Sequence, residues 1–490
     1  MSVVLACDLG GTSFRAALID AHGEFRALTS VAGPNSDDGH GFSEIDADLW
    51  WRAFCTAADT LAQTAPNDFA CIAGVAICGV TRTQVFVDVD GHPVRPAITW
   101  KDTRAQAAAT QLAEGSDHAE AAALNGFHPL ARLAWLRESE PAVAARVARV
   151  LDPKDYLNLR LAGRAASDPV SLARLIAAPV LLAAAGFDAS VIPDLCDPWE
   201  SVGGVQSDLP GSLSALAGCP VFCGSNDTWV GVVGLGAMQP GLAYNISGTT
   251  EVLGVMGAQA VAAEGLLTVD WLGQFQLGGP SQNGADIVTW LMSLLENDAA
   301  PGESLEALLA TPRHSQPVIF LPYLQGERVP YWDPSLRGAF VGLNRQHRAG
   351  DLAWAVLEGV AFLNRIVLET AEAAIGAQVA EIRFGGGAAR NARWQQVKAD
   401  VTGRPVAVGE TPEPGLLGAA IVAWTGLGRF ASLAQAQEKL VRIASRALPN
   451  PTHKAYYDAL FGLFRQAETA LAPVSRSLAN FAVGGARDDA

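Results

Sequence analysis

The sequence predicts an α/β protein with two related domains, and three observations support this fold class. The chain has 490 residues, half of them hydrophobic, which is long for a single core. Each half contains a strand, a turn rich in glycine and hydroxyl residues, and a second strand. Alternating strand and helix patterns follow both hairpins. We place the domain boundary near Met238–Gly241, giving domains over residues 1–238 and 239–480 and a mobile tail over residues 481–490.

The first half begins with a predicted meander of three strands, and its first turn is DLGGTSFR. Asp46 is a suitable cap for a helix over residues 46–64. The alanine-rich residues 147–186 are also expected to be helical. Buried strands are predicted at residues 3–7 and within CIAGVAICGV, further strands at residues 16–20 and 25–32, and a strand and turn in VFVDVDGHPV.

The second half repeats this order of elements. Residues 243–256 (AYNISGTTEVLGVM) predict a hairpin, and helical patterns follow at residues 284–297 and 350–376. In IRFGGGAARNARWQQVKADV, three glycines separate a strand from a helix. The sequence identity between the halves is slight, so their relation depends on the order of elements.

Charge and cysteine content restrict the partners of this chain. A net charge of −16 repels the phosphates of nucleic acids, so no nucleic-acid partner is expected. The sequence contains no run of eighteen uncharged apolar residues, so no membrane span is expected. The segment MSVVLACDLGG lacks the basic start of a signal peptide. Seven scattered cysteines without a CxxC pair are typical of free thiols in the cytoplasm. The oligomeric state stays open, with a homodimer among the alternatives.

The first motif that can carry chemistry is Asp8-Leu9-Gly10-Gly11-Thr12-Ser13-Phe14-Arg15. Glycines let a backbone approach phosphate closely, and hydroxyl groups add donors. A carboxylate at the end of a buried strand, such as Asp8, could hold Mg²⁺ through water. An ordinary hairpin turn has the same composition, so this motif alone leaves both interpretations open.

Two further glycine-rich turns lie in the second half. Gly248 and Thr249 belong to the hydroxyl-rich tip SGTT, which by itself is better explained as a plain turn. Gly386, Gly387 and Asn391 lie between a strand and a helix, where a planar base could lie against the backbone near a helix N-terminus. This run is not the GxGxxG fingerprint, and a tight strand-to-helix turn is an equal alternative.

The segment FCGSNDTWVGVVGLG contains one carboxylate, Asp227, among small and apolar residues, with no basic residue beside it. Such a carboxylate could accept a proton from a hydroxyl group. The local alternative is helix capping, because Ser225, Asn226 and Asp227 are all suitable cap residues.

Five stretches, in this order, together resemble the FGGY family of carbohydrate kinases over nearly the whole chain. They are DLGGTSFR, AITWKDTRA (97–105), GSNDTWVGVVGLG, FLPYLQGERVPYWDPSLRGAFVGL (320–343) followed by VLEGVAF, and FGGGAARNARWQQVKADVTGRPV with GLLGAAIVA (415–423). The resemblance implies two actin-like (RNase H-like) ATPase domains with a central cleft. It also implies ATP- and Mg²⁺-dependent phosphorylation of a hydroxyl group on a small sugar or polyol.

The resemblance assigns roles residue by residue. Asp227 matches the general base and Asp8 the acid that organises the metal ion. The positions that match ATP and phosphate contacts are Gly10, Gly11, Thr12, Ser13, Arg15, Gly248, Thr249, Gly284, Gly386, Gly387 and Asn391. The positions that match sugar contacts are Thr81, Arg82, Asp227 and Thr228.

This chain departs from the family pattern at a few positions. Gly11 replaces a threonine of the phosphate loop, and Arg390 stands where a small residue is common. Thr81-Arg82 differs from the pair in xylulokinases and in glycerol kinases. Arg82 could bind a carboxylate or vicinal hydroxyls, or form a structural ion pair. Glu327 and Arg328 are expected to form an internal ion pair.

The WKDTR segment and the chain length favour the xylulokinase-like branch, and hence a pentulose such as xylulose as the acceptor. The alternatives are gluconate, glycerol or another polyol with the same chemistry. An actin- or chaperone-like ATPase without a sugar substrate is the alternative from another functional class.

Overall fold

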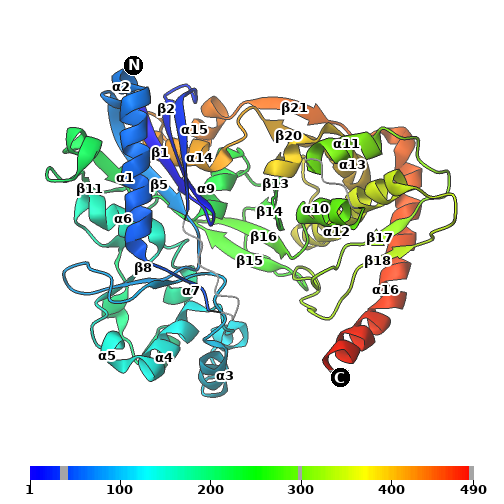
Figure 1. Ribbon diagram of the computed structural model, residues 1–490, viewed down its shortest axis with the longest axis horizontal. Coiled ribbons are helices and arrows are strands. Elements are labelled where there is room, and N and C mark those ends of the chain that lie inside the picture. Colours follow the sequence, from blue (N-terminus) through cyan, green and yellow to red (C-terminus); the bar gives the residue numbers. More distant parts are fainter. Residues whose placement is uncertain (34–41, 296–300, 485–490) are drawn as a thin grey trace, which may run out of the picture. The chain divides into compact units, whose positions relative to one another are not determined.

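The computed structural model describes residues 1–33, 42–295 and 301–484 (Figure 1). Their contacts divide the chain into two compact units. Unit 1 comprises Met1–Gly234 and Glu413–Val441, and unit 2 comprises Leu235–Pro412 and Arg442–Ala490. The sequence predicts one continuous second domain over residues 239–480. Residues Glu413–Val441 instead return to unit 1, because their helix α14 (Pro414–Gly426) packs on the first sheet.

Unit 1 is built around a six-stranded sheet, and Figure 1 shows helix α1 (Ala47–Thr64) running along it. The β1–β2–β3 meander is antiparallel, whereas β1, β5 and β12 run parallel. All seven residues of β1 are buried, since helix α1 packs on one side of the sheet and α14 on the other. The strand order is β11 (Ser201–Gly204), β12 (Pro220–Phe222), β5 (Ile72–Gly79), β1 (Val3–Leu9), β2 (Ser13–Asp20) and β3 (Phe25–Ala32).

The rest of unit 1 forms a smaller core of short helices and two-stranded sheets around Phe86, Ile98 and Leu133. The prediction of a helical segment over residues 147–186 is only partly right, because two short strands interrupt it. Arg149–Leu151 (β8) pairs with β6, and Ala166–Ser167 (β9) pairs with β10. The remaining elements are β4 (Glu44–Ile45), α2 (Pro66–Phe69), β6 (Val85–Val87), β7 (Ala97–Ile98), α3 (Gln106–Glu114), η1 (Ala119–Ala123), α4 (Pro129–Ser139), α5 (Pro141–Ala144), α6 (Pro153–Ala162), α7 (Ala173–Ile176), α8 (Pro179–Ala184), η2 (Ala189–Val191), β10 (Asp194–Leu195), η3 (Gly211–Leu216), α9 (Asp227–Gly234) and α15 (Leu433–Leu440).

Unit 2 contains a seven-stranded sheet whose first hairpin, β13–β14, is antiparallel and whose β13, β19 and β20 run parallel. The strand order is β15 (Leu267–Trp271), β16 (Gln274–Ser281), β14 (Glu251–Gly257), β13 (Leu242–Ser247), β19 (Glu381–Gly385), β20 (Val406–Gly409) and β21 (Ile443–Ala447). The long helix α12 (Ala349–Ile375) contributes many of the core residues. The other elements are α10 (Asp286–Leu294), α11 (Pro301–Leu309), β17 (Ile319–Leu321), β18 (Ala339–Val341), η4 (Gly387–Arg390), α13 (Ala392–Thr402), η5 (Pro451–His453) and α16 (Lys454–Gly484).

The elements expected from periodicity form close to their predicted positions. Asp46 caps α1 by accepting a hydrogen bond from the Asp48 backbone N–H at 3.0 Å. The helix expected at residues 284–297 is α10, and residues 296–297 lie outside the described residues. The expected tail over residues 481–490 overlaps the end of α16, and residues 485–490 also lie outside the described residues.

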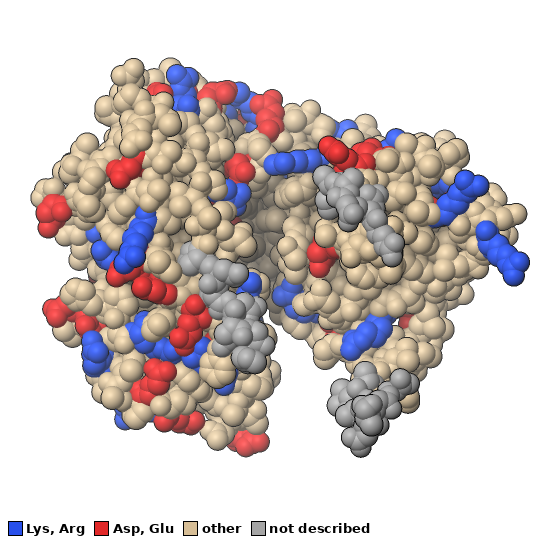
Figure 2. Space-filling model, viewed as in Figure 1, with Lys and Arg blue, Asp and Glu red and all other residues tan. Residues whose placement is uncertain are grey.

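The described surface mixes both signs of charge. On the face drawn in Figure 2, Lys and Arg side chains alternate with Asp and Glu and gather into no continuous basic surface among the described residues. In the same described ranges, no helix combines the length and the apolar character that crossing a bilayer requires.

Candidate active site

Asp8 lies near the end of β1, and strand register determines its neighbours. It is paired with Arg15 on β2 and with Cys78 on β5. Arg15 donates a hydrogen bond to Asp8 Oδ2 at 2.8 Å, and the Cys78 thiol faces Asp8 Oδ1 at 3.6 Å. Side chains alternate along a strand, so Asp8 points towards α14, where a Cβ added at Gly415 would lie 2.9 Å from Asp8 Oδ2. Burial raises the pKa of Asp8, and the charge of Arg15 opposes that rise.

Arg15 also forms an ion pair with Glu413, the residue that precedes α14. The Arg15 side chain is 33% exposed. The predicted phosphate contact therefore lies between two carboxylates, both of which belong to unit 1. Glu413 was not predicted as part of this site, because its partner is 398 residues away in sequence.

The predicted phosphate loop is the tip of the β1–β2 hairpin. A backbone hydrogen bond from the Gly10 N–H to the Ser13 carbonyl closes this turn at 2.9 Å. Gly11 and Thr12, at its apex, are exposed, and Gly10 and Ser13 are partly buried. The backbone of this tip is thus accessible to a ligand, as the motif predicts.

Asp227 is the first residue of α9, and it is not the residue that caps this helix. Asn226 caps the helix instead, because its Oδ1 accepts a hydrogen bond from the Trp229 backbone N–H at 2.9 Å. Asp227 Oδ1 accepts from the Thr228 backbone N–H at 2.6 Å and faces the Thr228 hydroxyl at 3.2 Å. A parallel bridge between Gly79 and Asn226 sets this turn beside the end of β5.

The electrostatic surroundings of Asp227 suit a proton acceptor. Among the described residues, no Lys, Arg or His makes an ion pair with its carboxylate within 4.0 Å. Burial and the negative charge of Asp8 raise the pKa of Asp227 to about 6. Its side chain is nevertheless only partly covered, so the carboxylate is open to a ligand.

Gly234 on α9 and Gly418 on α14 allow these two helices to pack closely. A Cβ at Gly234 would lie 1.8 Å from the Pro414 carbonyl oxygen, and one at Gly418 would lie 1.9 Å from the Val230 carbonyl oxygen. Helices α9 and α14 therefore approach so closely that neither position accepts a side chain. This contact holds the helix that begins at Asp227 against the helix that lies beside Asp8.

The predicted sugar contacts Thr81 and Arg82 lie in the loop after β5. Arg82 is exposed and adopts a positive φ of 55°, which is uncommon for a residue with a side chain. Arg132 on α4 stabilises this conformation by donating a hydrogen bond to the Arg82 carbonyl oxygen, and it also donates to the Thr99 carbonyl oxygen at 2.7 Å. Arg132 is fully buried, so it connects the Thr81–Arg82 loop to residues 97–105 from the protein interior.

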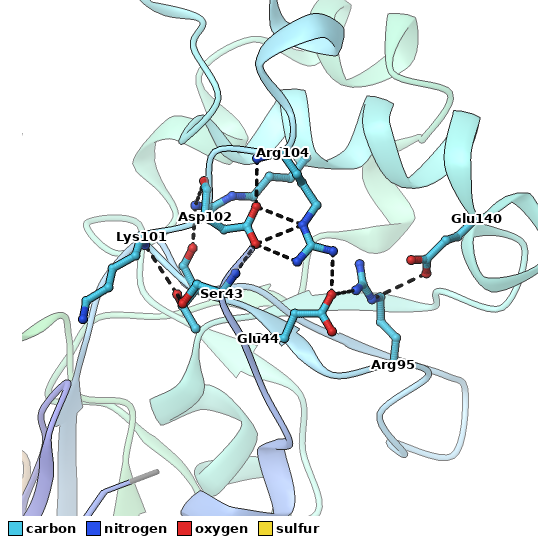
Figure 3. A network of polar contacts seen from close by, with 9 residues as sticks. Ser43, Glu44, Arg95, Lys101, Asp102, Arg104 and Glu140 are labelled. Atoms are coloured by element: carbon cyan, nitrogen blue, oxygen red, sulfur yellow. Dashed lines mark hydrogen bonds and ion pairs between the residues drawn. The ribbon is translucent and has the colours of Figure 1, made fainter. Parts of the chain in front are cut away.

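Residues 97–105 are held by a polar network (Figure 3). Asp102 is fully buried and accepts hydrogen bonds from the Ser43 backbone N–H at 2.7 Å and from the Arg104 guanidinium at 2.7 to 2.9 Å. Arg104 also pairs with Glu44, which in turn pairs with Arg95. In Figure 3 the Lys101 side chain points away from this cluster. The Asp and Arg of the WKDTR segment therefore stabilise its loop.

Trp100 in the same loop was not predicted as a site residue. It is 45% exposed, and its indole nitrogen would lie 3.9 Å from a Cβ added at Gly11. Its backbone N–H donates to the Thr83 hydroxyl at 3.2 Å, which connects it to the Thr81–Arg82 loop. Sequence contains no direct signal for this position, since an exposed tryptophan looks like a core tryptophan until the fold is known.

In unit 2, the predicted second phosphate tip is the exposed turn between β13 and β14. Gly248 and Thr249 are exposed, and the Gly248 N–H donates to the Thr250 carbonyl at 2.9 Å. Gly284 packs against this tip, because a Cβ there would lie 2.8 Å from the Thr249 carbonyl oxygen. The structure thus brings Gly284 next to a turn that lies 35 residues earlier in sequence.

The strand-to-helix turn after β19 meets the same tip. Gly386 has a φ of 87°, and a Cβ there would lie 2.2 Å from the Ser247 carbonyl oxygen. Gly387 faces open space. Asn391 caps α13 through the Trp394 N–H at 2.9 Å, and its amide donates to Glu306 at 2.8 Å. The predicted nucleotide residues Gly248, Thr249, Gly284 and Gly386 therefore meet in one place, with Gly387 beside them.

Glu327 and Arg328 do not form the expected ion pair among the described residues. The Glu327 carboxylate accepts from the Gln282 N–H at 2.6 Å and from the Asn283 amide at 3.0 Å. Arg328 donates to the Ser281 carbonyl at 2.7 Å. Both residues stabilise the turn that precedes Gly284, so their role is structural as expected but is directed at the backbone of this turn.

Comparison with known proteins agrees with this arrangement. The N-terminal domain of the FGGY family of carbohydrate kinases matches residues 3–234, and its C-terminal domain matches residues 243–427. Xylulose kinase of Bacillus subtilis is 26% identical, over 98% of this chain and 99% of its own length. Glycerol kinase of Methylibium petroleiphilum is 28% identical, over 88% of this chain and 92% of its own.

Among solved structures, a xylulose kinase from Brucella ovis has a TM-score of 0.88 at 27% identity. The match covers 96% of this chain and 100% of that one. The two matched domains together span most of the sequence. The chain therefore belongs to the FGGY family of carbohydrate kinases, phosphotransferases with an actin-like ATPase fold.

Proposed function

We propose that the chain transfers the γ-phosphoryl group of ATP to a hydroxyl of a pentulose such as xylulose, with Asp227 as the general base. In this proposal the sugar is bound in unit 1 by Thr81, Arg82 and Thr228. A hydroxyl group is a weak nucleophile at neutral pH. A carboxylate aligned with it accepts its proton as the oxygen attacks phosphorus.

The state of the Asp227 carboxylate is the observation that carries this proposal. With a pKa of about 6, about nine-tenths of this group is ionised at pH 7, yet it binds a proton more strongly than an ordinary aspartate. A neighbouring cation would lower that proton affinity, and the described residues place none in an ion pair with it. The Thr228 N–H directs one carboxylate oxygen and leaves the other for the substrate.

Asp8 is the proposed residue for Mg²⁺, bound through water. Carboxylate oxygens and water are the ligands that Mg²⁺ prefers, and within the described ranges Asp8 Oδ1 faces a weak thiol donor at 3.6 Å. When bound, the ion would neutralise charge on the phosphates.

The ATP phosphates are assigned to two turns. In unit 1 this is the tip with Gly10, Gly11, Thr12 and Ser13, next to Arg15. In unit 2 it is the place where Gly248, Thr249, Gly284, Gly386 and Gly387 meet. The exposed residues of these turns are Gly11, Thr12, Gly248, Thr249 and Gly387, and exposed turns of this kind can bind anions through backbone N–H and hydroxyl groups. Asn391 is assigned to the adenosine end.

The full-length similarity to xylulose kinases supports a pentulose as the acceptor. Arg82 supports an alternative, because an exposed guanidinium on a fixed backbone can bind a carboxylate with two hydrogen bonds, as gluconate would require. The similarity to a glycerol kinase supports a polyol as a further alternative.

The test measures ADP formation with xylulose, gluconate, glycerol and no acceptor, each with ATP and Mg²⁺. Xylulose is expected to give the highest kcat/KM. Asp227→Asn is expected to lower sugar-dependent kcat by at least about 100-fold while ATP still binds. Asp90→Asn, in an exposed turn, is the matched control. Equal ADP formation with and without every acceptor would instead favour an ATPase without a sugar substrate.

A further inference from the structure

A buried polar cluster lies next to the segment over residues 223–227, which ends at the proposed base. The cluster consists of Lys154, Asp155 and Asp168, in which the Lys154 ammonium pairs with Asp155 and, at 2.9 Å, with Asp168. Each of these side chains is at most 1% exposed. Lys154 belongs to α6, which packs against β5 and β12, and residues 223–227 begin where β12 ends. The cluster therefore borders the segment that leads to the base.

A hydroxyl group connects this segment to the cluster. Ser225 is fully buried two positions before Asp227, and it donates a hydrogen bond to Asp168 Oδ1 at 2.7 Å. The same oxygen accepts from the backbone N–H groups of Val170 at 3.1 Å and Ser171 at 3.0 Å. Asp168 is thus fixed by its own turn and by its ion pair, so it can hold Ser225 in one place.

The backbone of the segment is held by the same helix and by β5. The Cys223 carbonyl accepts hydrogen bonds from the Asn158 amide at 2.9 Å and from the Lys154 ammonium at 3.5 Å. Gly79, at the end of β5, forms a parallel bridge with Asn226. Gly79 also packs on the cluster, because a Cβ there would lie 3.4 Å from Lys154 Cβ. Positions 223, 225 and 226 are therefore each fixed by a separate contact.

The charge of the cluster favours positioning over stability as its role. Burial disfavours the charged form of Lys154, but Asp155 and Asp168 oppose this effect and raise its pKa well above the usual value. The ammonium therefore stays charged in the interior. A buried ion pair often adds little net stability compared with apolar side chains, because both charges lose their hydration. It does fix the directions of its members, and here they face Ser225 and the Cys223 carbonyl.

We propose that Lys154, Asp168 and Ser225 are positioning residues that set the place of the Asp227 carboxylate, an inference that rests on the proposed role of Asp227 as the base. They act through the segment over residues 223–227 and make or break no bond themselves. A general base must lie within about 2.6 to 3.2 Å of the proton that it accepts. A displacement of about 1 Å can lower the rate by about 100-fold, so a segment fixed at three positions has a direct effect on turnover.

The first test is independent of kinase activity and measures hydrogen exchange by mass spectrometry in the full chain. Ser225→Ala removes the hydroxyl and leaves Asp168 its two backbone donors. Faster exchange is expected in the peptide that covers residues 223–230. Ser171→Ala is the matched control, because its hydroxyl lies in the same turn as Asp168 and has no hydrogen-bond partner among the described residues. Unchanged exchange in Ser225→Ala, or equally fast exchange in Ser171→Ala, would overturn the proposal.

The second test is a double-mutant cycle on sugar-dependent ADP formation. Ser225→Ala is expected to lower kcat by about tenfold or more, with KM for ATP unchanged within about twofold. In the Asp227→Asn background the same change is expected to have no further effect, because that variant has no base left to position. An equal fall in both backgrounds would make the role of Ser225 purely structural and would refute the inference.

Ser225→Cys is the second variant should alanine impair folding. A thiol has nearly the same shape as the hydroxyl but is a weaker donor, so kcat should fall and exchange should rise in the same direction by smaller amounts. A wild-type kcat in Ser225→Cys with faster exchange would contradict the proposal. Failure of the kinase proposal has a different signature. Full turnover of Asp227→Asn would overturn the role of Asp227 as the base, while hydrogen exchange still decides whether Ser225 holds the segment.

Discussion

Replacing Asp227 by asparagine should stabilise unit 1 while it removes the proposed catalytic base. Asparagine has nearly the same shape, and its Oδ1 can still accept the hydrogen bond from the Thr228 N–H. It lacks the charge that burial and Asp8 disfavour. The two effects therefore oppose each other, as expected for a site that sacrifices stability for function.

The magnitude follows from the pKa of Asp227. Folding raises this pKa from its ordinary value of 3.8 to about 6. Each pKa unit corresponds to 1.36 kcal/mol, so the ionised carboxylate lowers the free energy of unfolding by about 3 kcal/mol at most. The folded state holds the proton more tightly than the unfolded state. The stability of the wild type therefore falls as the pH rises from about 4 to about 6, and the cost is constant above that.

The assay compares thermal unfolding of the wild type and Asp227→Asn between pH 4.5 and pH 8. Unfolding is followed by calorimetry, because the chain has 12 tryptophans and their fluorescence would mix the signals of both units. At pH 8 a stabilisation of about 3 kcal/mol would raise Tm by about 5 °C for a unit of this size, and the difference should shrink towards pH 4. Asp90→Asn controls for the loss of one charge on the surface.

A variant that is less stable than the wild type at pH 8 would refute this reasoning. It would mean that the Asp227 carboxylate is stabilised by contacts that outweigh its burial. A stabilisation of equal size at all pH values would also contradict it, because a desolvated carboxylate costs stability only where it is ionised.

The remaining predictions concern catalysis, specificity and packing. The kcat/KM of the wild type should fall tenfold per pH unit below about 6, as Asp227 takes up a proton, in a pH-rate profile. Arg82→Ala should raise KM for the sugar more than KM for ATP, and Lys101→Ala should change neither; an unchanged sugar KM would make Arg82 structural. Gly418→Ala should lower the free energy of unfolding by about 2 kcal/mol or more in denaturant titrations, because its Cβ would lie 1.9 Å from a carbonyl oxygen. Asp8→Asn should raise the Mg²⁺ concentration needed for half-maximal turnover, and chelation of Mg²⁺ should abolish turnover in both proteins.

Local sequence patterns predicted the structure correctly where the residues that favour a turn are the same residues that are candidates for ligand binding. A glycine- and hydroxyl-rich stretch between two apolar runs predicts a hairpin, and both hairpins form with exposed tips. Strand alternation then determines that Asp8 and Arg15, as cross-strand partners, lie on one face. The choice between base and cap at Asp227 could not be made from composition, since Ser225, Asn226 and Asp227 all make good caps. Only the backbone geometry assigns that role to Asn226.

Contacts between distant residues were not predictable in the same way. Arg132 looks like one more polar residue on a helix, yet it is fully buried and binds the carbonyl groups of two separate loops. The Ala-rich residues 147–186 have strong helix propensity, and pairing of Arg149–Leu151 with β6 overrides it locally. In each case the partner determines the structure, and the partner lies far away in sequence.

Helix α14 shows how far this dependence on distant partners extends. The chain completes the sheet of unit 2 up to β20 before it returns to unit 1 as Glu413–Val441. That return supplies Glu413 to the Arg15 guanidinium, places Gly415 beside Asp8 and packs Gly418 against α9. The packing around Asp8 and Asp227 is therefore incomplete until nearly the whole chain has been synthesised. A mutation in α14 can thus alter the surroundings of Asp8 and Asp227, although α14 lies about 190 residues after Asp227 in sequence.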